Sequence, residues 1–217
     1  MERKSFFVTR YARDVREAVV FVAKPVAMYL ALNLVILVVT SLVAQPSVKI
    51  GTLRPVDTIP VKIMELVSVG IVLGIITSLS EKKFDLKVIA LATVFVVLLD
   101  LDHLPSLFNV QEPIRPDHTL LFLATSSVIL YLTGRSSIEV PLISASSFLA
   151  HIASDNGIFG LFAPFSFQYV TLNEYDPYLY AGAVILAVIA GRAKVRRLRE
   201  RPELNINKTN ESHKKGV

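Results

Sequence analysis

The chain has no cysteine among its 217 residues. It therefore has no disulfide framework, no thiolate metal site and no cysteine nucleophile. Charged residues are also scarce, at 19% of the chain, against about 25% in an average soluble domain. Apolar residues make up 53% and gather in long runs. The composition therefore argues against a soluble domain and indicates a membrane protein. It excludes a disordered chain, a collagen and a coiled coil.

Six apolar segments are candidates for membrane-spanning helices. They cover residues 25–44, 60–79, 84–103, 118–134, 138–155 and 177–192. A helix needs about 20 apolar residues to cross a bilayer, and the first two segments reach that length. The fifth contains several serines together with His151 and Asp155, so it is expected to turn a polar face into a bundle. The predicted fold class is all-α: a polytopic membrane helical bundle of about six transmembrane helices plus an N-terminal amphipathic helix.

Both ends of the chain are basic. Residues 1–24 combine Lys and Arg with apolar side chains at roughly helical spacing, which predicts a cytoplasmic amphipathic helix on a membrane surface. Residues 25–192 then form the six-span membrane domain, and residues 193–217 form a basic, then polar, cytoplasmic tail that is expected to be disordered at its end. The expected partners are membrane lipids, with anionic headgroups at the basic segments and no nucleic acid.

The distribution of Lys and Arg predicts the orientation. If both termini are cytoplasmic, 19 of the 23 Lys and Arg residues lie on the cytoplasmic side and four lie in the three outer loops. Cytoplasmic loops carry an excess of these residues. The sequence therefore predicts a multi-pass protein of the plasma (cytoplasmic or inner) membrane with both termini in the cytoplasm.

Three of the four histidines fall on one face of this predicted bundle. His103 lies at the outer end of the third span, His118 opens the fourth, and His151 lies about one turn inside the outer end of the fifth. Each has an acidic residue within four positions. These acidic residues are Asp100, Asp102, Asp117 and Asp155.

An acidic cluster that contains imidazoles is suited to a divalent cation. His151 and Asp155 are four residues apart and Asp100 and His103 are three apart, so each pair shares one face of a helix. The predicted metal ligands are Asp100, His103, His118, His151 and Asp155. Zinc is the expected metal, with manganese and iron as alternatives, because the donors are imidazole and carboxylate without thiolate.

Each of these residues also has an ordinary structural interpretation. A histidine at the end of a span commonly marks the membrane interface, and Asp117 is suited to cap the following helix. Asp155 begins an Asp-Asn-Gly turn sequence. The metal hypothesis is therefore based on the number of histidines and aspartates that the predicted bundle places on the same face.

Three short blocks resemble the motifs of the predicted membrane-bound metal-dependent hydrolases, a family with LexA-regulated members in bacterial inner membranes. Residues 98–105 (LLDLDHLP) resemble its P-D-x-D-H block, and residues 115–120 (RPDHTL) resemble H-R-G-x-T-H-S. Residues 151–155 (HIASD) with 160–166 (GLFAPFS) resemble H-x-x-x-D followed by G-x-x-L-x-W-P. The order and approximate spacing agree over about residues 98–168. The family is itself distantly similar to the zinc phospholipase C enzymes.

The chain departs from that family at three places. It has no histidine before His103, Leu99 stands where the family has proline, and no histidine precedes Arg115 in the second block. The remaining donors suffice for one metal, or for two that share carboxylates, and are few for a cluster of three zinc ions. A degenerate, non-catalytic member of the family is therefore an open alternative.

Signatures of two other hydrolase classes are missing. Lipid phosphatases of the phosphatidic-acid type need an arginine shortly before the H-x-x-x-D histidine and a P-S-G-H block, and residues 140–150 contain no arginine. The chain has no P-S-G-H and no H-E-x-x-H of the zinc proteases. His151 is therefore not expected to be a phosphoryl-accepting nucleophile.

The residues and the resemblance together predict a membrane-embedded metal-dependent hydrolase with its site at the extracytoplasmic face, acting on a phosphoester or a lipid headgroup. The metal would lower the pKa of a bound water. Asp102 or Asp117 would act as general base or orient an imidazole, and Arg115 would hold a phosphate through its planar guanidinium. The alternatives are a non-catalytic or structural metal-binding membrane protein and an ion- or proton-coupled transporter.

Overall fold

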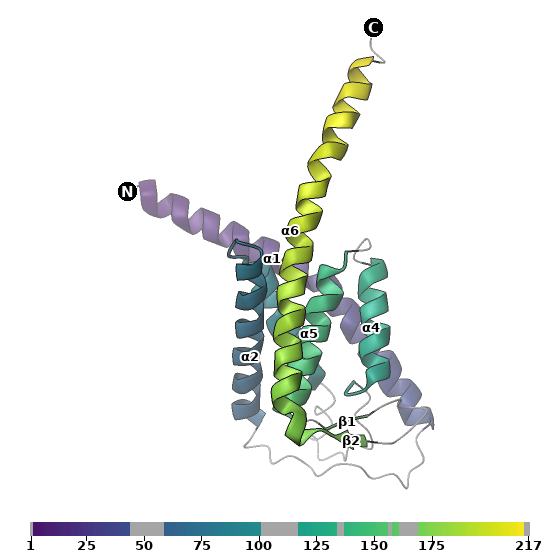
Figure 1. Ribbon diagram of the computed structural model, residues 1–217. Helices are drawn as coiled ribbons and strands as arrows, with labels where there is room; N and C mark the ends of the chain where they lie inside the picture. The colour runs from purple at the N-terminus through teal and green to yellow at the C-terminus, as the bar shows by residue number, and fades with distance from the viewer. Residues whose placement is uncertain are drawn as a thin grey trace.

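The computed structural model describes residues 2–43, 59–100, 117–133, 137–155, 158–160 and 169–214. These residues are mainly helical, so the predicted all-α class is confirmed (Figure 1). Each predicted apolar segment coincides with a helix. The helices are α1 (Glu2–Val43), α2 (Ile59–Ser80), α3 (Leu86–Leu98), α4 (Leu120–Thr133), α5 (Glu139–Ser154) and α6 (Asp176–Lys214), with a short 3-10 helix, η3 (Asn173–Tyr175), before α6.

A small antiparallel sheet is the one element type that the sequence pattern did not predict. It pairs β1 (Ile158–Gly160) with β2 (Tyr169–Thr171), so that Phe159 lies opposite Val170. Figure 1 places this hairpin at the end of the bundle where α5 ends and α6 begins. We call this the hairpin end of the bundle.

Within the described residues, three helices are long and apolar enough to cross a membrane. Their candidate spans are Val15–Ile36, Val61–Ser80 and Asp176–Arg197. The outer surfaces of these helices are apolar, and Leu34 and Met64, for example, are 62% and 71% exposed. Large exposed apolar surfaces mark contact with lipid or a partner, so the structure supports membrane association. The helices α3 and α4 are apolar but shorter, with 13 and 14 residues.

At its N-terminus the structure differs from the predicted division between a surface helix and a first span. The helix α1 continues without a break through Pro25, and its apolar window already begins at Val15. The reason is tertiary, because Ala18 and Val22 are buried and Val22 belongs to the common apolar core. The basic residues before this window extend the same helix.

The C-terminal tail also differs from its prediction. It was expected to be disordered at its end, but α6 continues to Lys214. Residues 192–201 consist largely of Arg, Lys, Leu, Glu and Ala, which are good helix formers. Extending an existing helix also avoids the cost of nucleating a new one.

The polar side of α5 faces the interior, as the sequence predicts. Ser146 Oγ donates a hydrogen bond to the Ala183 carbonyl of α6 at 2.7 Å, and Ser147 Oγ donates to the Ala92 carbonyl of α3 at 3.2 Å. Both serines are buried. The two serines hold α5 between α3 and α6. This sets the position of His151, which lies one turn after Ser147 on α5.

Glycines allow α2 and α3 to pack closely. A Cβ atom added at Gly70 would meet the backbone of Thr93, and one added at Gly74 would meet the Cα of Ile89. Small residues are used in this way where membrane helices approach each other. The close approach fixes α3 against α2, and the chain leaves α3 directly into Asp100.

Charged groups close the opposite end of the bundle. Lys194 Nζ lies 2.8 Å from Glu81 Oε2 and 2.8 Å from Asp85 Oδ2, and Asp85 caps α3 by accepting from the Lys87 amide at 3.0 Å. Burial raises the pKa of the Glu81 carboxyl, and the hydrogen bond from Lys194 partly opposes this. At Asp85 burial also raises the pKa, but the contacts with Lys194 outweigh it, so the net shift is downward.

We expect Gly74→Ala to destabilise the protein by about 1–3 kcal/mol, because the new methyl group meets backbone that cannot rotate away. Gly182→Ala is the matched control, since its Cβ would meet only the Leu149 Cδ1 atom at 3.2 Å. Both changes add the same helix propensity. Thermal unfolding in detergent measures the difference, and equal midpoints for the two variants would show that α2 and α3 are not closely packed.

Candidate metal centre

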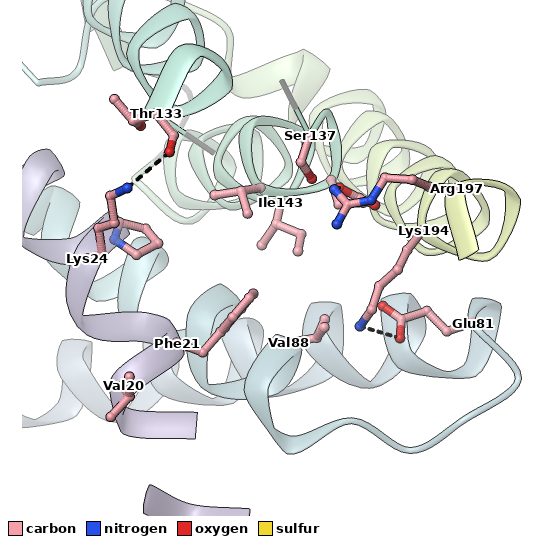
Figure 2. Close-up of a pocket in the computed structure, with 13 residues that line it drawn as sticks. Val20, Phe21, Lys24, Glu81, Val88, Thr133, Ser137, Ile143, Lys194 and Arg197 are labelled. Carbon is pink, nitrogen blue, oxygen red and sulfur yellow. Dashed lines mark hydrogen bonds and ion pairs between the residues drawn. The ribbon is translucent and has the colours of Figure 1, made fainter. Parts of the chain in front are cut away.

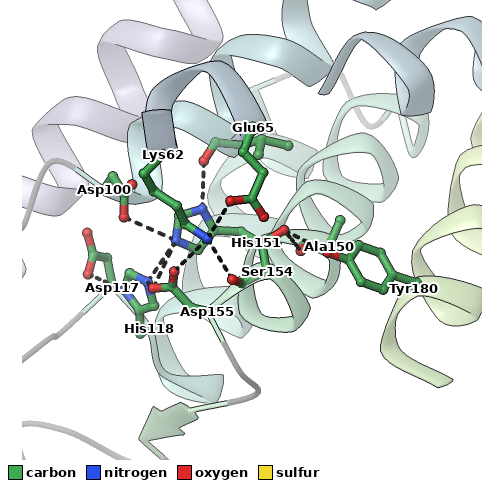
Figure 3. A network of polar contacts seen from close by, with 11 residues as sticks. Lys62, Glu65, Asp100, Asp117, His118, Ala150, His151, Ser154, Asp155 and Tyr180 are labelled. Carbon is green, nitrogen blue, oxygen red and sulfur yellow. Dashed lines mark hydrogen bonds and ion pairs between the residues drawn. The ribbon is translucent and has the colours of Figure 1, made fainter. Parts of the chain in front are cut away.

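Three separate segments bring acidic and imidazole side chains together at the hairpin end of the bundle. Asp100 follows α3, His118 precedes α4, and His151 lies in the last turn of α5, with Asp155 as the residue that ends that helix. Both imidazoles are fully buried, and the Asp155 side chain is 1% exposed. Figure 3 shows the four side chains converging on one point.

The distances fit shared ligation of one ion. One donor atom from each of Asp100, His118, His151 and Asp155 lies within 4.8 Å of all the others. His118 Nε2 is 2.9 Å from His151 Nε2 and 3.5 Å from Asp155 Oδ2, and His151 Nε2 is 3.4 Å from Asp100 Oδ1. Two ligands about 2.1 Å from one zinc ion lie roughly 3.0–3.4 Å apart at octahedral or tetrahedral angles. The contacts of 2.9, 3.4 and 3.5 Å are close to this spacing, whereas His151 Nε2 and Asp155 Oδ2, 3.8 Å apart, would move closer around an ion.

The second nitrogen of each ring determines what the facing nitrogens can do. His151 Nδ1 lies 2.8 Å from the Val96 carbonyl oxygen, which can only accept a hydrogen bond. His118 Nδ1 lies 3.0 Å from Asp117 Oδ1, a carboxylate oxygen that also accepts. Both Nδ1 atoms therefore carry the proton, so both Nε2 atoms of neutral rings present lone pairs to each other. A cation beside them removes this repulsion, and a metal ion is coordinated by such lone pairs.

The contact between His118 and Asp117 is the carboxylate–imidazole arrangement that orients metal-binding histidines in proteins. Asp117 lies beside the ring nitrogen that faces away from the cluster. In the structure Asp117 thus contacts the candidate ligand His118. The sequence analysis offered two roles for Asp117, general base or orientation of an imidazole, and this contact corresponds to the second.

A lysine that sequence analysis did not select completes the site. Lys62 Nζ lies 3.2 Å from Asp155 Oδ1, donates to the Ser154 carbonyl, and lies 3.3 Å from the half-exposed Glu65 carboxylate. The Lys62 side chain is only 15% exposed. A signal was present, because a lysine near the start of an otherwise apolar span is unusual.

The described part of the site is rich in acidic groups. Asp100, Asp117 and Asp155 surround the two imidazoles, and the Lys62 ammonium contacts Asp155. Such a combination of carboxylates and imidazoles suits a divalent cation.

The structure thus brings together four of the five predicted metal ligands, which are Asp100, His118, His151 and Asp155. The fifth, His103, lies outside the described residues, as do the predicted catalytic residues Asp102 and Arg115. The acidic and imidazole groups therefore meet on one face, as predicted. A His/Asp cluster that could hold a metal ion is present, and its geometry alone does not identify the metal.

Comparison with known proteins gives no further assignment. No family model matches the chain, and no curated protein or solved structure is significantly similar to it. The resemblance to metal-dependent hydrolases therefore stays a prediction. The evidence for a metal centre is the geometry of the cluster.

We expect the purified wild type to carry about one divalent ion per chain, and His151→Ala to lose it, because a buried ligand is removed. His213→Ala, in the C-terminal part of α6, is the matched control and should keep the ion. Elemental mass spectrometry after gel filtration in detergent measures the content. A wild type that remains free of metal after reloading, or a His151→Ala variant that keeps its ion, would contradict the assignment.

Lys62→Met should have opposite effects on the two forms of the protein. Without metal, it removes the ion pair between Lys62 and the buried Asp155 and should cost about 3 kcal/mol. With metal, the cation balances the carboxylates, and removal of the nearby ammonium should strengthen binding. The rise in melting temperature on adding metal to chelator-treated protein should therefore exceed that of wild type and of the exposed control Lys83→Met. An unchanged rise would show that Lys62 and the ion do not share Asp155.

Proposed function

We propose that this protein is a membrane-embedded metal-dependent hydrolase with its metal site at the extracytoplasmic face. The proposal includes six spans, one for each helix, with both termini in the cytoplasm of a plasma-membrane protein. Its support is the bias of Lys and Arg and the even number of apolar helices in the described part of the chain. The metal centre then lies at the end where Lys and Arg are few.

Helix lengths give the depth of the site. At 1.5 Å per residue, α2 is about 33 Å long and can cross the hydrocarbon core of about 30 Å, whereas the 13 residues of α3 cover about 20 Å. The two helices are antiparallel neighbours joined by a short turn. If both helices start at the inner boundary, Asp100, two residues beyond α3, would lie within about 10 Å of the outer membrane boundary. A site at this depth is suited to an amphiphilic substrate whose polar group enters from the interface.

The observation that carries the proposal is the pair of Nε2 atoms at 2.9 Å together with the two adjacent carboxylates. His118, His151, Asp100 and Asp155 would hold a divalent metal, which when bound would activate water for hydrolysis at neutral pH. Zinc suits the imidazole and carboxylate donors, with manganese and iron as alternatives. Zinc, manganese and iron are distinguished by the same elemental analysis.

The chain's own residues have distinct parts in this proposal. Asp117 holds the His118 ring so that Nε2 faces the cluster. Lys62 donates to Asp155, to the Ser154 carbonyl and to Glu65, so its part is to hold Asp155 in place. Arg115 is the residue that the sequence predicts for an anionic oxygen of a phosphoester or a phospholipid headgroup.

A structural metal site is the second candidate, and one observation favours it. Both imidazoles are fully buried in the described structure, and the ligands come from three separate segments. Closed sites of this kind contribute folding energy directly. The same ion would then join α3, α4 and α5 without turnover.

The two candidates differ in turnover. A phosphodiester chromogenic substrate and phospholipids in mixed micelles are incubated with the metal-loaded protein, with chelator-treated protein, with Asp117→Asn and with His213→Ala. The hydrolase proposal predicts turnover that needs the metal and falls about 10–100-fold in Asp117→Asn, with His213→Ala unchanged. Equal hydrolysis with and without metal would exclude it. Bound metal and a raised melting temperature without turnover would establish the structural site instead.

A further inference from the structure

A cavity lies at the end of the bundle opposite the metal centre. It has a volume of about 380 Å³ and lies between α1, the α2–α3 turn, α3, the end of α4, α5 and α6 (Figure 2). Pockets for small molecules measure about 300–1,000 Å³, so this one has room for a small ligand or for the polar part of a larger one. Its chemistry differs from that of the metal centre, because acidic and basic groups line it together.

The central feature of this cavity is Glu139 at the start of α5. The residue is 7% exposed, and its Oε2 accepts from Arg197 Nη1 at 3.2 Å. The other oxygen, Oε1, is buried and has no hydrogen-bond partner among the described residues. A buried carboxylate oxygen without a partner is costly. The cavity that Glu139 lines can supply a donor in the form of a ligand.

Hydrogen-bond donors are also available around the same space. Arg197 Nε is buried and has no partner in the described part of the chain. Lys24 Nζ, on α1, donates only to the Thr133 carbonyl at 3.2 Å and makes no ion pair with a described carboxylate. Figure 2 shows Lys24 on one side of the space and Arg197 on the other. Lys24 can receive an anionic group, whereas Arg197 is already paired with Glu139, and Lys194 with Glu81 and Asp85.

Apolar side chains form the remaining walls. They are Val20, Phe21, Val88, Val140 and Ile143. Val20 is 67% exposed and Phe21 is 41% exposed on α1, within the candidate span Val15–Ile36. The apolar wall therefore continues onto surface that lipid would cover.

We propose that this cavity binds the headgroup of an amino-phospholipid, with a phosphate and a primary ammonium. The ammonium donates to the Glu139 carboxylate, the phosphate accepts from Lys24 Nζ on the other side of the space, and the acyl chains lie along Val20 and Phe21. A primary ammonium is required because it can donate a hydrogen bond, whereas the quaternary ammonium of a choline headgroup has no proton to donate. The proposal is independent of the function assigned to the metal centre.

Lipid binding to the delipidated, full-length protein in detergent tests this proposal by native mass spectrometry. Phosphatidylethanolamine should bind about tenfold more tightly than phosphatidylcholine with the same chains, which is the effect of one hydrogen bond to a charged group. Glu139→Gln should remove most of this preference. Lys24→Met should weaken both lipids, because it acts on the phosphate that they share. Phosphoethanolamine without chains should bind far more weakly than the lipid.

The matched controls are Glu174→Gln and Lys83→Met, which change exposed groups outside the cavity and should leave both affinities unchanged. Lys24 is exposed, so Lys24→Met remains informative if Glu139→Gln does not fold. Equal binding of the two lipids by wild type, or unchanged binding in Lys24→Met, would overturn the proposal. Binding of free phosphoethanolamine as tight as that of the lipid would overturn the assignment to a lipid. Metal content should be the same in all these variants, which separates this result from any failure of the metal centre.

Discussion

The approach of two imidazole nitrogens to 2.9 Å is the constraint around which the hairpin end of this protein is organised. The Val96 carbonyl and the Asp117 carboxylate fix the proton of each ring on the side away from the partner. Two lone pairs would then repel each other in a buried space. The nearby carboxylates of Asp100 and Asp155 make that space attractive to a cation. The packing of α3 and α5 matters because it maintains this short distance.

Packing and chemistry are coupled through a few small or polar residues. The glycines of α2 bring α3 close, and Ser147 ties α5 to α3 through the carbonyl of Ala92. The next turn of α3 presents the Val96 carbonyl to His151, one turn after Ser147 on α5. Two successive contacts between α3 and α5 are thus polar. The same interface that stabilises the bundle also sets the tautomer of a candidate metal ligand.

The two ends of the bundle use charge differently. At the hairpin end, buried carboxylates gather around two imidazoles, and Lys62 contacts one of these carboxylates, which suits a metal ion. At the other end, Lys194 joins two acids and Glu139 is paired on one oxygen only. The helix α6 passes both regions, with Tyr180 hydrogen-bonded to Ser154 near the metal centre and Arg197 at the cavity. A membrane protein must enclose or pair such groups, because the surrounding hydrocarbon offers them no partners.

The sequence by itself determined the all-helical class, the position of each apolar helix and the inward face of α5, because these follow from local hydrophobicity and from the cost of exposing polar groups to lipid. It also indicated the convergence of Asp100, His118, His151 and Asp155. Consecutive spans run in opposite directions, so the end of one span and the start of the next lie on the same face of the bundle. Tertiary structure alone decided that α1 is continuous, because Val22 is buried against the other helices. It also decided that Lys62 contacts Asp155, that Val96 orients His151, and that Glu139 lines a cavity. Such contacts join residues far apart in the chain, and hydrophobic periodicity says nothing about which side chains meet when helices pack.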